Sequence, residues 1–321
     1  MKKTNKYPNT NIIMLITIAA LIIGLAVLAK ASDVAVMRTA KLSKLLGINK
    51  ITAGFIFLAI STSLPELTIA IFSSLRGEGL LSVGNLIGAN IINMTLIIGL
   101  VAVFCAFSLK KKDSMLMEQA VVFSSIIAFF AIFLKKIDFI FGIFCIIIFY
   151  VFSKIMVKEG LKTDEKLNHE LRTPAVLKSI FFVLLAVAFI IISAKFVTDS
   201  AVEISSAFGL KESLIGATLL ALGTTLPELS VGIAAIRRKD IKLAIGNSVG
   251  SVAANITLIL GIAAIINPIS LGTAEISLMW FLIASGLAFL FISSSGKFDR
   301  KRGIALISAF AIYLIYVMVI A

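Results

Sequence analysis

Long apolar runs, separated by short polar or charged segments, extend along the whole chain. They fall at residues 10–30, 48–75, 79–108, 115–134, 137–157, 175–198, 211–236, 240–266, 273–294 and 302–320. A membrane-spanning helix needs about 20 predominantly apolar residues, and each run is about that long. The pattern therefore predicts an all-α membrane protein with about ten transmembrane helices.

Composition and charge agree with this pattern. Of the 321 residues, 60% are hydrophobic, and the mean hydropathy is +1.09, whereas a soluble domain is about 45–50% apolar. The longest polar stretch, about 154–172, is too short for a soluble domain. The net charge of +13 does not indicate nucleic acid, because the basic residues lie at the ends of apolar runs, where they orient a membrane protein.

The sequence of residues 54–100 recurs at residues 216–262. The two copies align without a gap at an offset of 162, and about two positions in five are identical. The duplication predicts two halves of five spans, residues 1–160 and 175–321, joined by a cytoplasmic linker at 161–174. Because five is an odd number, the second half must enter the membrane upside down, as in transporters with inverted-topology repeats.

The distribution of Lys and Arg predicts an orientation. If both termini lie outside, the cytoplasmic loops hold 22 of the 30 basic residues, as the positive-inside rule requires. The loop after the first copy's acidic motif, SSLRGEGLL, has one basic residue, and the equivalent AIRRKDIKL has four. Opposite charge bias in equivalent loops favours inverted halves. We expect a multi-pass protein of the plasma membrane.

Each copy carries one carboxylate inside an apolar stretch. The two motifs are Ser61-Thr62-Ser63-Leu64-Pro65-Glu66 and Gly223-Thr224-Thr225-Leu226-Pro227-Glu228. A proline inside a span frees backbone carbonyls, and the hydroxyls of Thr62, Ser63, Thr224 and Thr225 lie within about one turn of a glutamate. Such all-oxygen sites suit hard cations such as Ca²⁺. Pro-Glu is also an ordinary helix start, but a charge inside a span costs at least about 2.5–3.5 kcal/mol. Because such a costly charge occurs at the same place in both copies, a functional role is favoured over a helix start alone.

A second motif follows in both copies. It reads Gly84-Asn85-x-x-Gly88-Ala89-x-x-x-Asn93 and Gly246-Asn247-x-x-Gly250-Ser251-x-x-x-Asn255. The small residues should permit close helix approach. The asparagines share a helix face with positions 89 and 251, which should point into the protein. Asn85 and Asn247 could either bond to a neighbouring helix or bind the cation, and the sequence does not favour one role over the other. For Asn93 and Asn255 the site is favoured.

With both motifs in order in both halves, the chain resembles the cation/Ca²⁺ exchanger superfamily, and within it the Na⁺/Ca²⁺ exchangers with their two alpha repeats. The resemblance implies alternating access, with spans 1 and 6 sliding against the core, and no enzyme activity, resident cofactor or protein partner. It also implies a cluster of cation ligands. Glu66 and Glu228 would be the central Ca²⁺ ligands, joined by oxygens of Thr62, Thr224, Ser63, Thr225, Ala59, Ala221, Ser251, Asn93 and Asn255.

Three departures from the family pattern bear on the transported ions. Ser61 replaces a usual glycine, Ala89 replaces a usual serine, and Asn255 stands where some members have aspartate. The resemblance implies antiport of Ca²⁺ for Na⁺, and the last two departures keep an H⁺/Ca²⁺ antiporter on the same scaffold as the alternative. More distant alternatives are a cation channel and an intramembrane hydrolase that uses two acids.

Overall fold

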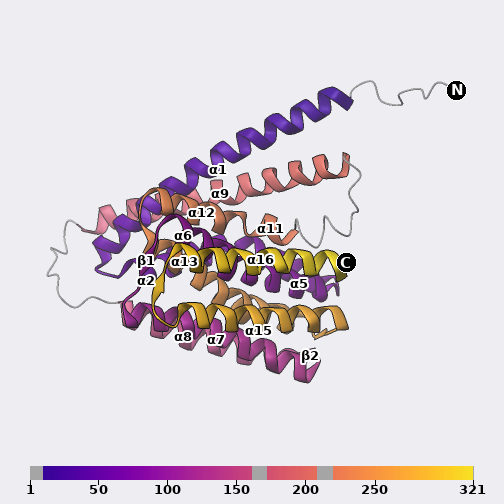
Figure 1. Cartoon of the computed structure of the whole chain (residues 1–321). Helices are drawn as coiled ribbons and strands as arrows, with labels where there is room; N and C mark the ends of the chain where they lie inside the picture. Colours follow the sequence, from indigo (N-terminus) through magenta and orange to yellow (C-terminus); the bar gives the residue numbers. More distant parts are fainter. Residues whose placement is uncertain (1–9, 161–171, 208–219, 321) are drawn as a thin grey trace.

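The computed structural model describes residues 10–160, 172–207 and 220–320, which are nearly all helical (Figure 1). The first half contains α1 (Thr10–Leu46), α2 (Lys50–Gly54), the π-helix η1 (Phe55–Ala59), α3 (Ile60–Thr62), α4 (Leu64–Leu75), α5 (Gly79–Ile91), the π-helix η2 (Ile92–Ile97), α6 (Ile98–Phe104), β1 (Phe107–Ser108), α7 (Lys111–Leu134), β2 (Lys136–Ile137) and α8 (Phe139–Gly160). The second half contains α9 (Arg172–Ala207), α11 (Leu220–Thr224), α12 (Leu226–Arg237), α13 (Ile241–Ala254), the π-helix η4 (Asn255–Ile259), α14 (Leu260–Ile266), β3 (Ile269–Ser270), α15 (Thr273–Ser293), β4 (Lys297–Phe298) and α16 (Arg300–Ile320).

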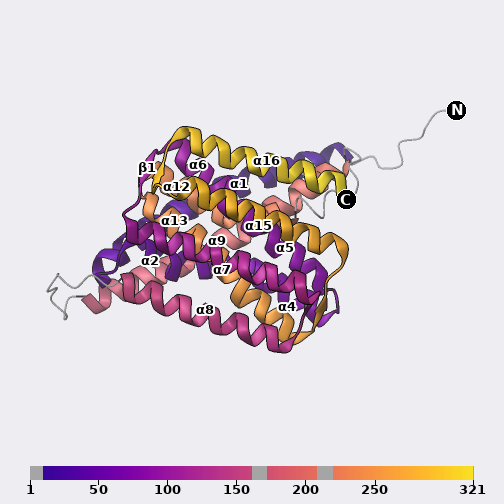
Figure 2. The ribbon, with the colours of Figure 1, turned by 60° about the horizontal axis from the view of Figure 1, so that its bottom comes forward.

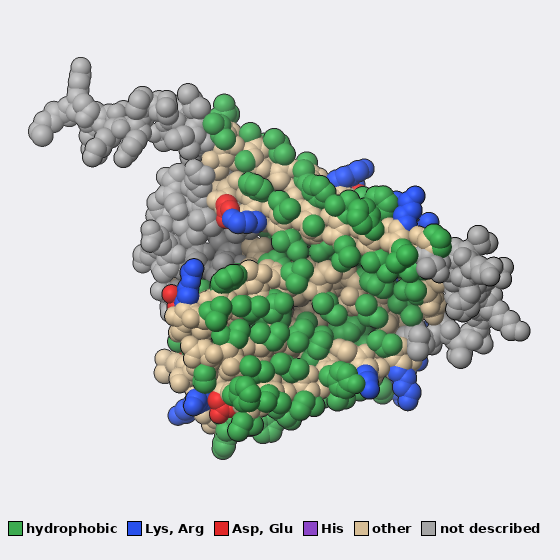
Figure 3. All heavy atoms as spheres, turned by 180° about the vertical axis from the view of Figure 1, so that it is seen from behind, with side chains coloured by type: hydrophobic (Ala, Val, Ile, Leu, Met, Phe, Trp, Pro, Cys, Tyr) green, Lys and Arg blue, Asp and Glu red, His purple; other side chains and the backbone are tan. Residues whose placement is uncertain are grey.

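Eight of the described helices are long and apolar enough to cross a membrane. A ninth span is the pair Lys50–Thr62 and Leu64–Leu75, which bends by 42° between its two parts. The predicted span 211–236 is represented by α11 and α12, and its first part lies outside the described residues, as does most of the predicted linker 161–174. Apolar side chains cover the sides of the helices and Lys and Arg gather toward their ends (Figure 3), so the protein is an integral, multi-pass membrane protein.

Two spans are longer than the sequence predicts. The first, expected at 10–30, continues to Leu46, and the sixth, expected at 175–198, covers Arg172–Ala207. The first prediction was too short because it ended the span at Lys30, where the apolar run is interrupted. Asp33, which follows, is paired with Arg237 and Arg238 at the end of α12, so the helix continues past both charges.

The helices form layers around a buried centre. On one side α16, α15, α7 and α8 lie side by side (Figure 2), and on the opposite side α1 packs along α9 (Figure 1). Between these layers lie the two most buried spans, Gly79–Phe104 and Ile241–Ile266. These are the spans that carry the second motif of each repeat, so both copies of that motif lie at the centre of the protein.

Two short antiparallel ribbons show that the halves are inverted. β1 pairs with β4, with Phe107 opposite Phe298, and β2 pairs with β3, with Ile137 opposite Ile269. β1 and β2 lie beyond opposite ends of α7, whose 24 residues span about 36 Å. Since β3 is the repeat equivalent of β1, equivalent strands lie on opposite faces of the membrane. The fold is therefore an all-α membrane protein built from two inverted-topology repeats.

Candidate cation-binding site

The acidic motif lies at a helix break in both repeats. Ser63 and Thr225 have φ of −81° and −88° with ψ near zero, and α4 and α12 begin immediately after them with proline in the first turn. Glu66 and Glu228 are therefore in the first turn of a helix, where the helix dipole favours a negative charge. The helix-start interpretation is confirmed, and it is compatible with a cation site, because the break places each carboxylate in the middle of a span.

Both glutamates are completely buried, with 0% of each exposed, and they are close enough to interact electrostatically. Glu228 Oε1 accepts hydrogen bonds from the hydroxyls of Ser63, at 3.3 Å, and Ser251, at 3.2 Å. Glu228 Oε2 and both carboxylate oxygens of Glu66 have no hydrogen-bond partner. Three oxygens of two buried carboxyl groups thus lack a donor, which is unusual for buried polar atoms and leaves them available to a cation.

The first threonine of each acidic motif bonds across to the other repeat. Thr62 donates to Asn247 Oδ1 at 3.3 Å, and Thr224 donates to Asn85 Oδ1 at 3.0 Å. The two bonds are equivalent under the repeat and join α3 to α13 and α11 to α5. Asn85 and Asn247 therefore each bond to a neighbouring helix that itself carries candidate site residues.

The remaining candidate residues surround the two glutamates unequally. The Ala59 carbonyl accepts from the Ser63 amide at 3.0 Å, and the Ala221 carbonyl accepts from the Thr225 hydroxyl at 2.7 Å. Thr225 therefore does not donate to Glu66 as its counterpart Ser63 donates to Glu228. Ala89, the counterpart of Ser251, has no hydroxyl. Glu66 therefore lacks the two hydrogen bonds that Ser63 and Ser251 donate to Glu228, although the Thr224 hydroxyl interacts with it.

Asn93 and Asn255 lie where the helices change from α to π, in η2 and at the start of η4. The Asn93 amide nitrogen donates to the Ala89 carbonyl at 3.0 Å, and that of Asn255 donates to Asn90 Oδ1 at 3.1 Å. The Oδ1 atoms of both have no hydrogen-bond partner and are buried. Single π-helical turns occur often at functional sites. Sequence reasoning did not predict them, and it did not single out Asn90.

The arrangement offers oxygen atoms and no nitrogen or sulfur ligand. Five buried oxygens without a donor come from Glu66, Glu228, Asn93 and Asn255, and hydroxyls of the acidic motif lie beside them. Within the described residues, no three His, Cys, Asp or Glu side chains gather as a transition-metal site would require. Carboxylate, amide and hydroxyl oxygens are the ligands of hard cations.

Comparison with known proteins agrees with this chemistry. The sequence profile of the family described as "Sodium/calcium exchanger protein" matches residues 16–158 and 178–319, which include both repeats. The chain belongs to this exchanger family. It is therefore a membrane transporter, and the similarity covers both halves.

Relatives of the exchanger span nearly its whole length. The chain is 29% identical over 316 residues to "Inner membrane protein YrbG" of Escherichia coli (strain K12), covering 94% of this chain and 96% of the relative. It is 28% identical over 343 residues to "Sodium/calcium exchanger MaX1" of Methanosarcina acetivorans, covering 92% and 96%. The solved structure of the sodium-calcium exchanger NCX_Mj, soaked with Na⁺ and Sr²⁺, superimposes with a TM-score of 0.83 at 26% identity, covering 93% of this chain and 98% of that one.

Proposed function

We propose that this exchanger is a secondary antiporter that moves Ca²⁺ across the membrane in exchange for Na⁺. The observation that carries the proposal is the pair of fully buried, interacting carboxylates of Glu66 and Glu228, three of whose oxygens lack a donor. Both carboxylates come from equivalent positions of inverted repeats, which is where transporters of this architecture bind their ions. The names of the relative MaX1 and of the solved exchanger NCX_Mj support Ca²⁺ and Na⁺ as the transported ions.

The charge of the cluster supports exchange rather than passive conduction. Two ionised glutamates carry about −2, and one Ca²⁺ neutralises them, as do several Na⁺ held partly by neutral oxygens. Empty, the two buried carboxylates repel each other in an apolar environment. The loaded protein therefore changes conformation more easily than the empty one, which couples the movement of one ion to the return of the other.

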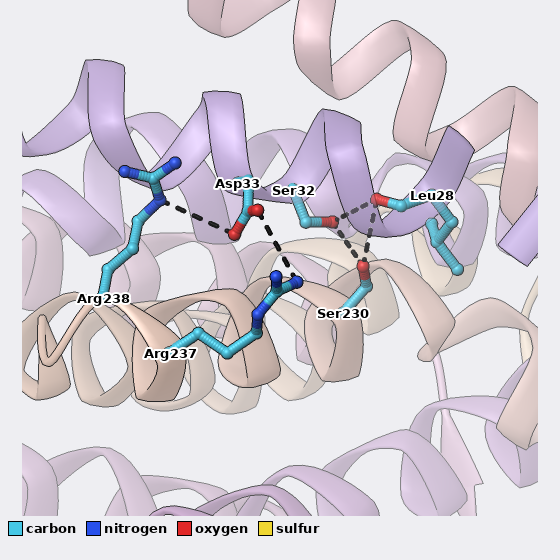
Figure 4. A network of polar contacts seen from close by, with 6 residues as sticks. All are labelled: Leu28, Ser32, Asp33, Ser230, Arg237 and Arg238. Atoms are coloured by element: carbon cyan, nitrogen blue, oxygen red, sulfur yellow. Dashed lines mark hydrogen bonds and ion pairs between the residues drawn. The ribbon is translucent and has the colours of Figure 1, made fainter. Parts of the chain in front are cut away.

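The contacts of α1 with α12 support alternating access. Asp33 of α1 lies 3.6 Å from both Arg237 and Arg238 at the end of α12, and Ser32 shares a hydrogen bond with Ser230 (Figure 4). This network holds α1 against α12 near the β1–β4 side. Among the described residues, the repeat counterparts α9 and α4 are hardly in contact. We infer that the protein is closed on the β1–β4 side, and that α1 and α9 move as a pair to open it.

The basic residues support an orientation for this movement. Lys and Arg are concentrated in the loops of the β1–β4 side, including 110–112, 237–239 and 297–302. By the positive-inside rule this side faces the cytoplasm, so both termini lie outside the plasma membrane. The closed network is then on the cytoplasmic side, and the conformation faces outward.

One observation favours a second candidate, an H⁺/Ca²⁺ antiporter. Glu66 has no counterpart of the hydrogen bonds that Ser63 and Ser251 donate to Glu228, and Ala89 gives its surroundings no hydroxyl. The Na⁺ site on that side therefore has one oxygen fewer than the site around Ser251. A proton can neutralise Glu66 without those ligands.

The deciding experiment measures Ca²⁺ uptake into proteoliposomes that hold the purified protein. Vesicles loaded with Na⁺ are compared with vesicles that have an outward proton gradient and no Na⁺. We expect uptake to follow the Na⁺ gradient. Uptake that follows only the proton gradient would establish the second candidate, and uptake without any counter-ion would make the protein a channel.

Two matched variants connect this activity to the site. Glu66→Gln and Glu228→Gln keep the size of the side chain and remove its charge, so each should abolish Ca²⁺ uptake in correctly inserted protein. Glu275→Gln changes a glutamate at the start of α15, where it bonds the Gly272 amide, and should leave uptake intact. Near-normal uptake by either site variant would contradict the proposed site.

A further inference from the structure

Asn90 is a fully buried polar residue beside the candidate cation site, on α5. Its exposed fraction is 0%. Its amide nitrogen donates to Ser124 Oγ of α7 at 3.2 Å and to the backbone carbonyl of Val252 at 3.1 Å, and its Oδ1 accepts from the amide nitrogen of Asn255 at 3.1 Å. Asn90 thus joins three helices and satisfies its whole amide group without contributing an atom to the oxygen cluster.

The Val252 carbonyl fixes which way the Asn90 amide points. A backbone carbonyl can only accept hydrogen bonds, so Asn90 must turn its nitrogen toward Val252 and its oxygen toward Asn255. Asn255 then faces an acceptor and must present its own nitrogen to it. The Oδ1 of Asn255 is left on the other branch of the amide, where it has no hydrogen-bond partner. The Val252 carbonyl thus sets the orientation of the Asn90 amide, and the Asn90 amide sets the orientation of the Asn255 amide.

The two repeats orient their site asparagines by different means. In the first repeat, the nitrogen of Asn93 bonds directly to the carbonyl of Ala89, four residues earlier in its own helix. In the second repeat, Asn255 depends on Asn90 from the other half. The repeat counterpart of Asn90 is Val252, so Asn90 contacts its own counterpart and lies near the pseudo-two-fold axis. Because Asn90 lies near this axis and its counterpart is a valine, it can orient the site asparagine of the second repeat only.

We propose that Asn90 is a positioning residue that makes Asn255 present an oxygen, and not an NH₂ group, to the transported cation. This inference rests on the proposed function. The last side-chain torsion of asparagine is broad and roughly two-fold, so without Asn90 the Asn255 amide can turn over. Its NH₂ group would then repel the cation and donate to the buried carboxylates, in competition with Ca²⁺.

The test compares Asn90→Leu in two backgrounds, the natural sequence and Asn255→Asp. In the natural background, we expect the half-saturating Ca²⁺ concentration for uptake to rise about 10–100-fold, as for other residues that orient metal ligands. In the Asn255→Asp background, the same change should not raise this value, because a carboxylate has an oxygen on both branches and cannot turn the wrong way, and because Asn90→Leu also removes the oxygen that this carboxylate would face. Ser124→Ala removes one partner of Asn90 but leaves the Val252 carbonyl, and should change the value less than about twofold.

Each outcome of this comparison is decisive. Equal losses in both backgrounds would mean that Asn90 only supports packing, and no loss in the natural background would mean that Asn255 is oriented without it. An Asn255→Asp protein that no longer binds Ca²⁺ would also contradict the inference, since that change keeps the oxygen that faces the site. Ca²⁺-induced shifts of Tm in detergent separate this from the proposed function. If the function is wrong, the natural protein itself shows no shift. If only the inference is wrong, the natural protein shifts, and Asn90→Leu either leaves the shift unchanged or reduces it equally in both backgrounds.

Discussion

Substitution of Gly246 by alanine should stop transport while leaving the protein folded. Gly246 lies where α13 crosses α2, and a Cβ atom there would overlap the carbonyl oxygen of Ile51 and lie 2.8 Å from its carbonyl carbon and 2.9 Å from its Cα. These are backbone atoms that cannot turn aside. On the facing helix, a Cβ at Gly54 would lie 2.6 Å from the Leu243 carbonyl oxygen, so the two backbones touch directly.

The expected magnitude follows from the two effects of the added methyl group. Restoring ordinary contacts requires the helices to separate by about 1 Å, and such overpacking costs about 1–3 kcal/mol. Replacing glycine in a helix returns about 1 kcal/mol, so the net loss of stability is small. However, the same crossing sets the distances from Ser63 to Ser251 and from Thr62 to Asn247. A displacement of about 1 Å in a positioned site can reduce activity about 100-fold.

The assay is Ca²⁺ uptake into proteoliposomes, with Tm measured on the same preparation. The matched control is Gly232→Ala on α12, where the new Cβ would meet only a methyl group of Ile97, at 3.0 Å. We expect about 100-fold slower uptake for Gly246→Ala and nearly normal uptake for Gly232→Ala, with both proteins folded. Uptake by Gly246→Ala within about twofold of the natural protein would refute the claim that this crossing sets the geometry of the site.

Three further predictions test other parts of the structure. Ala89→Ser restores the hydroxyl that Ser251 supplies in the other repeat, so the Na⁺ concentration for half-maximal exchange should fall several-fold; an unchanged or higher value would show that this position does not contribute to Na⁺ binding. Asp33→Asn removes two partly exposed ion pairs worth about 0.2–1 kcal/mol each, so a cysteine at position 230 should react about two- to thirtyfold faster with a reagent added on the β1–β4 side, and an unchanged rate would mean that the network does not hold α1 on α12. In a protein without Cys105 and Cys145, the only cysteines of the chain, Glu78→Cys and Lys239→Cys should be labelled from opposite sides of the membrane, and labelling from the same side would contradict the inverted topology.

The parts of the candidate site that the sequence indicates are the duplicated ones. Glu66 and Glu228 stand out because an unpaired charge in a span is expensive and because each occurs at the same place in a copy. The departure at Ala89 also had a visible consequence, since Glu66 lacks the hydroxyl donor that Ser251 gives to Glu228. The predicted close approach of small residues is confirmed at Gly246 and Gly250, which meet α2 and η1 directly.

Other features could not be predicted from the repeat comparison. In the alignment of the two repeats, Asn90 is aligned with Val252. A search for polar residues that occur in both repeats finds the glutamates but not Asn90. The π-helical turns at Asn93 and Asn255 depend on how neighbouring helices pack, and no local residue pattern specifies them. The length of α1 was underestimated because hydropathy treats Asp33 as an exposed charge, whereas its arginine partners lie about 200 residues later in the chain.

The strand pairing has a consequence for the origin of the fold. Each half contributes one strand to each ribbon, so that β1 pairs with the counterpart of β2, and β2 with the counterpart of β1. This reciprocity is the signature of an isologous contact between two copies related by a two-fold axis. One half alone contains both strand types, so two copies inserted in opposite directions form both ribbons without any linker. The present chain is in this sense a covalently joined antiparallel homodimer, whose halves became free to diverge once they were joined, as Asn90 and Val252 have done.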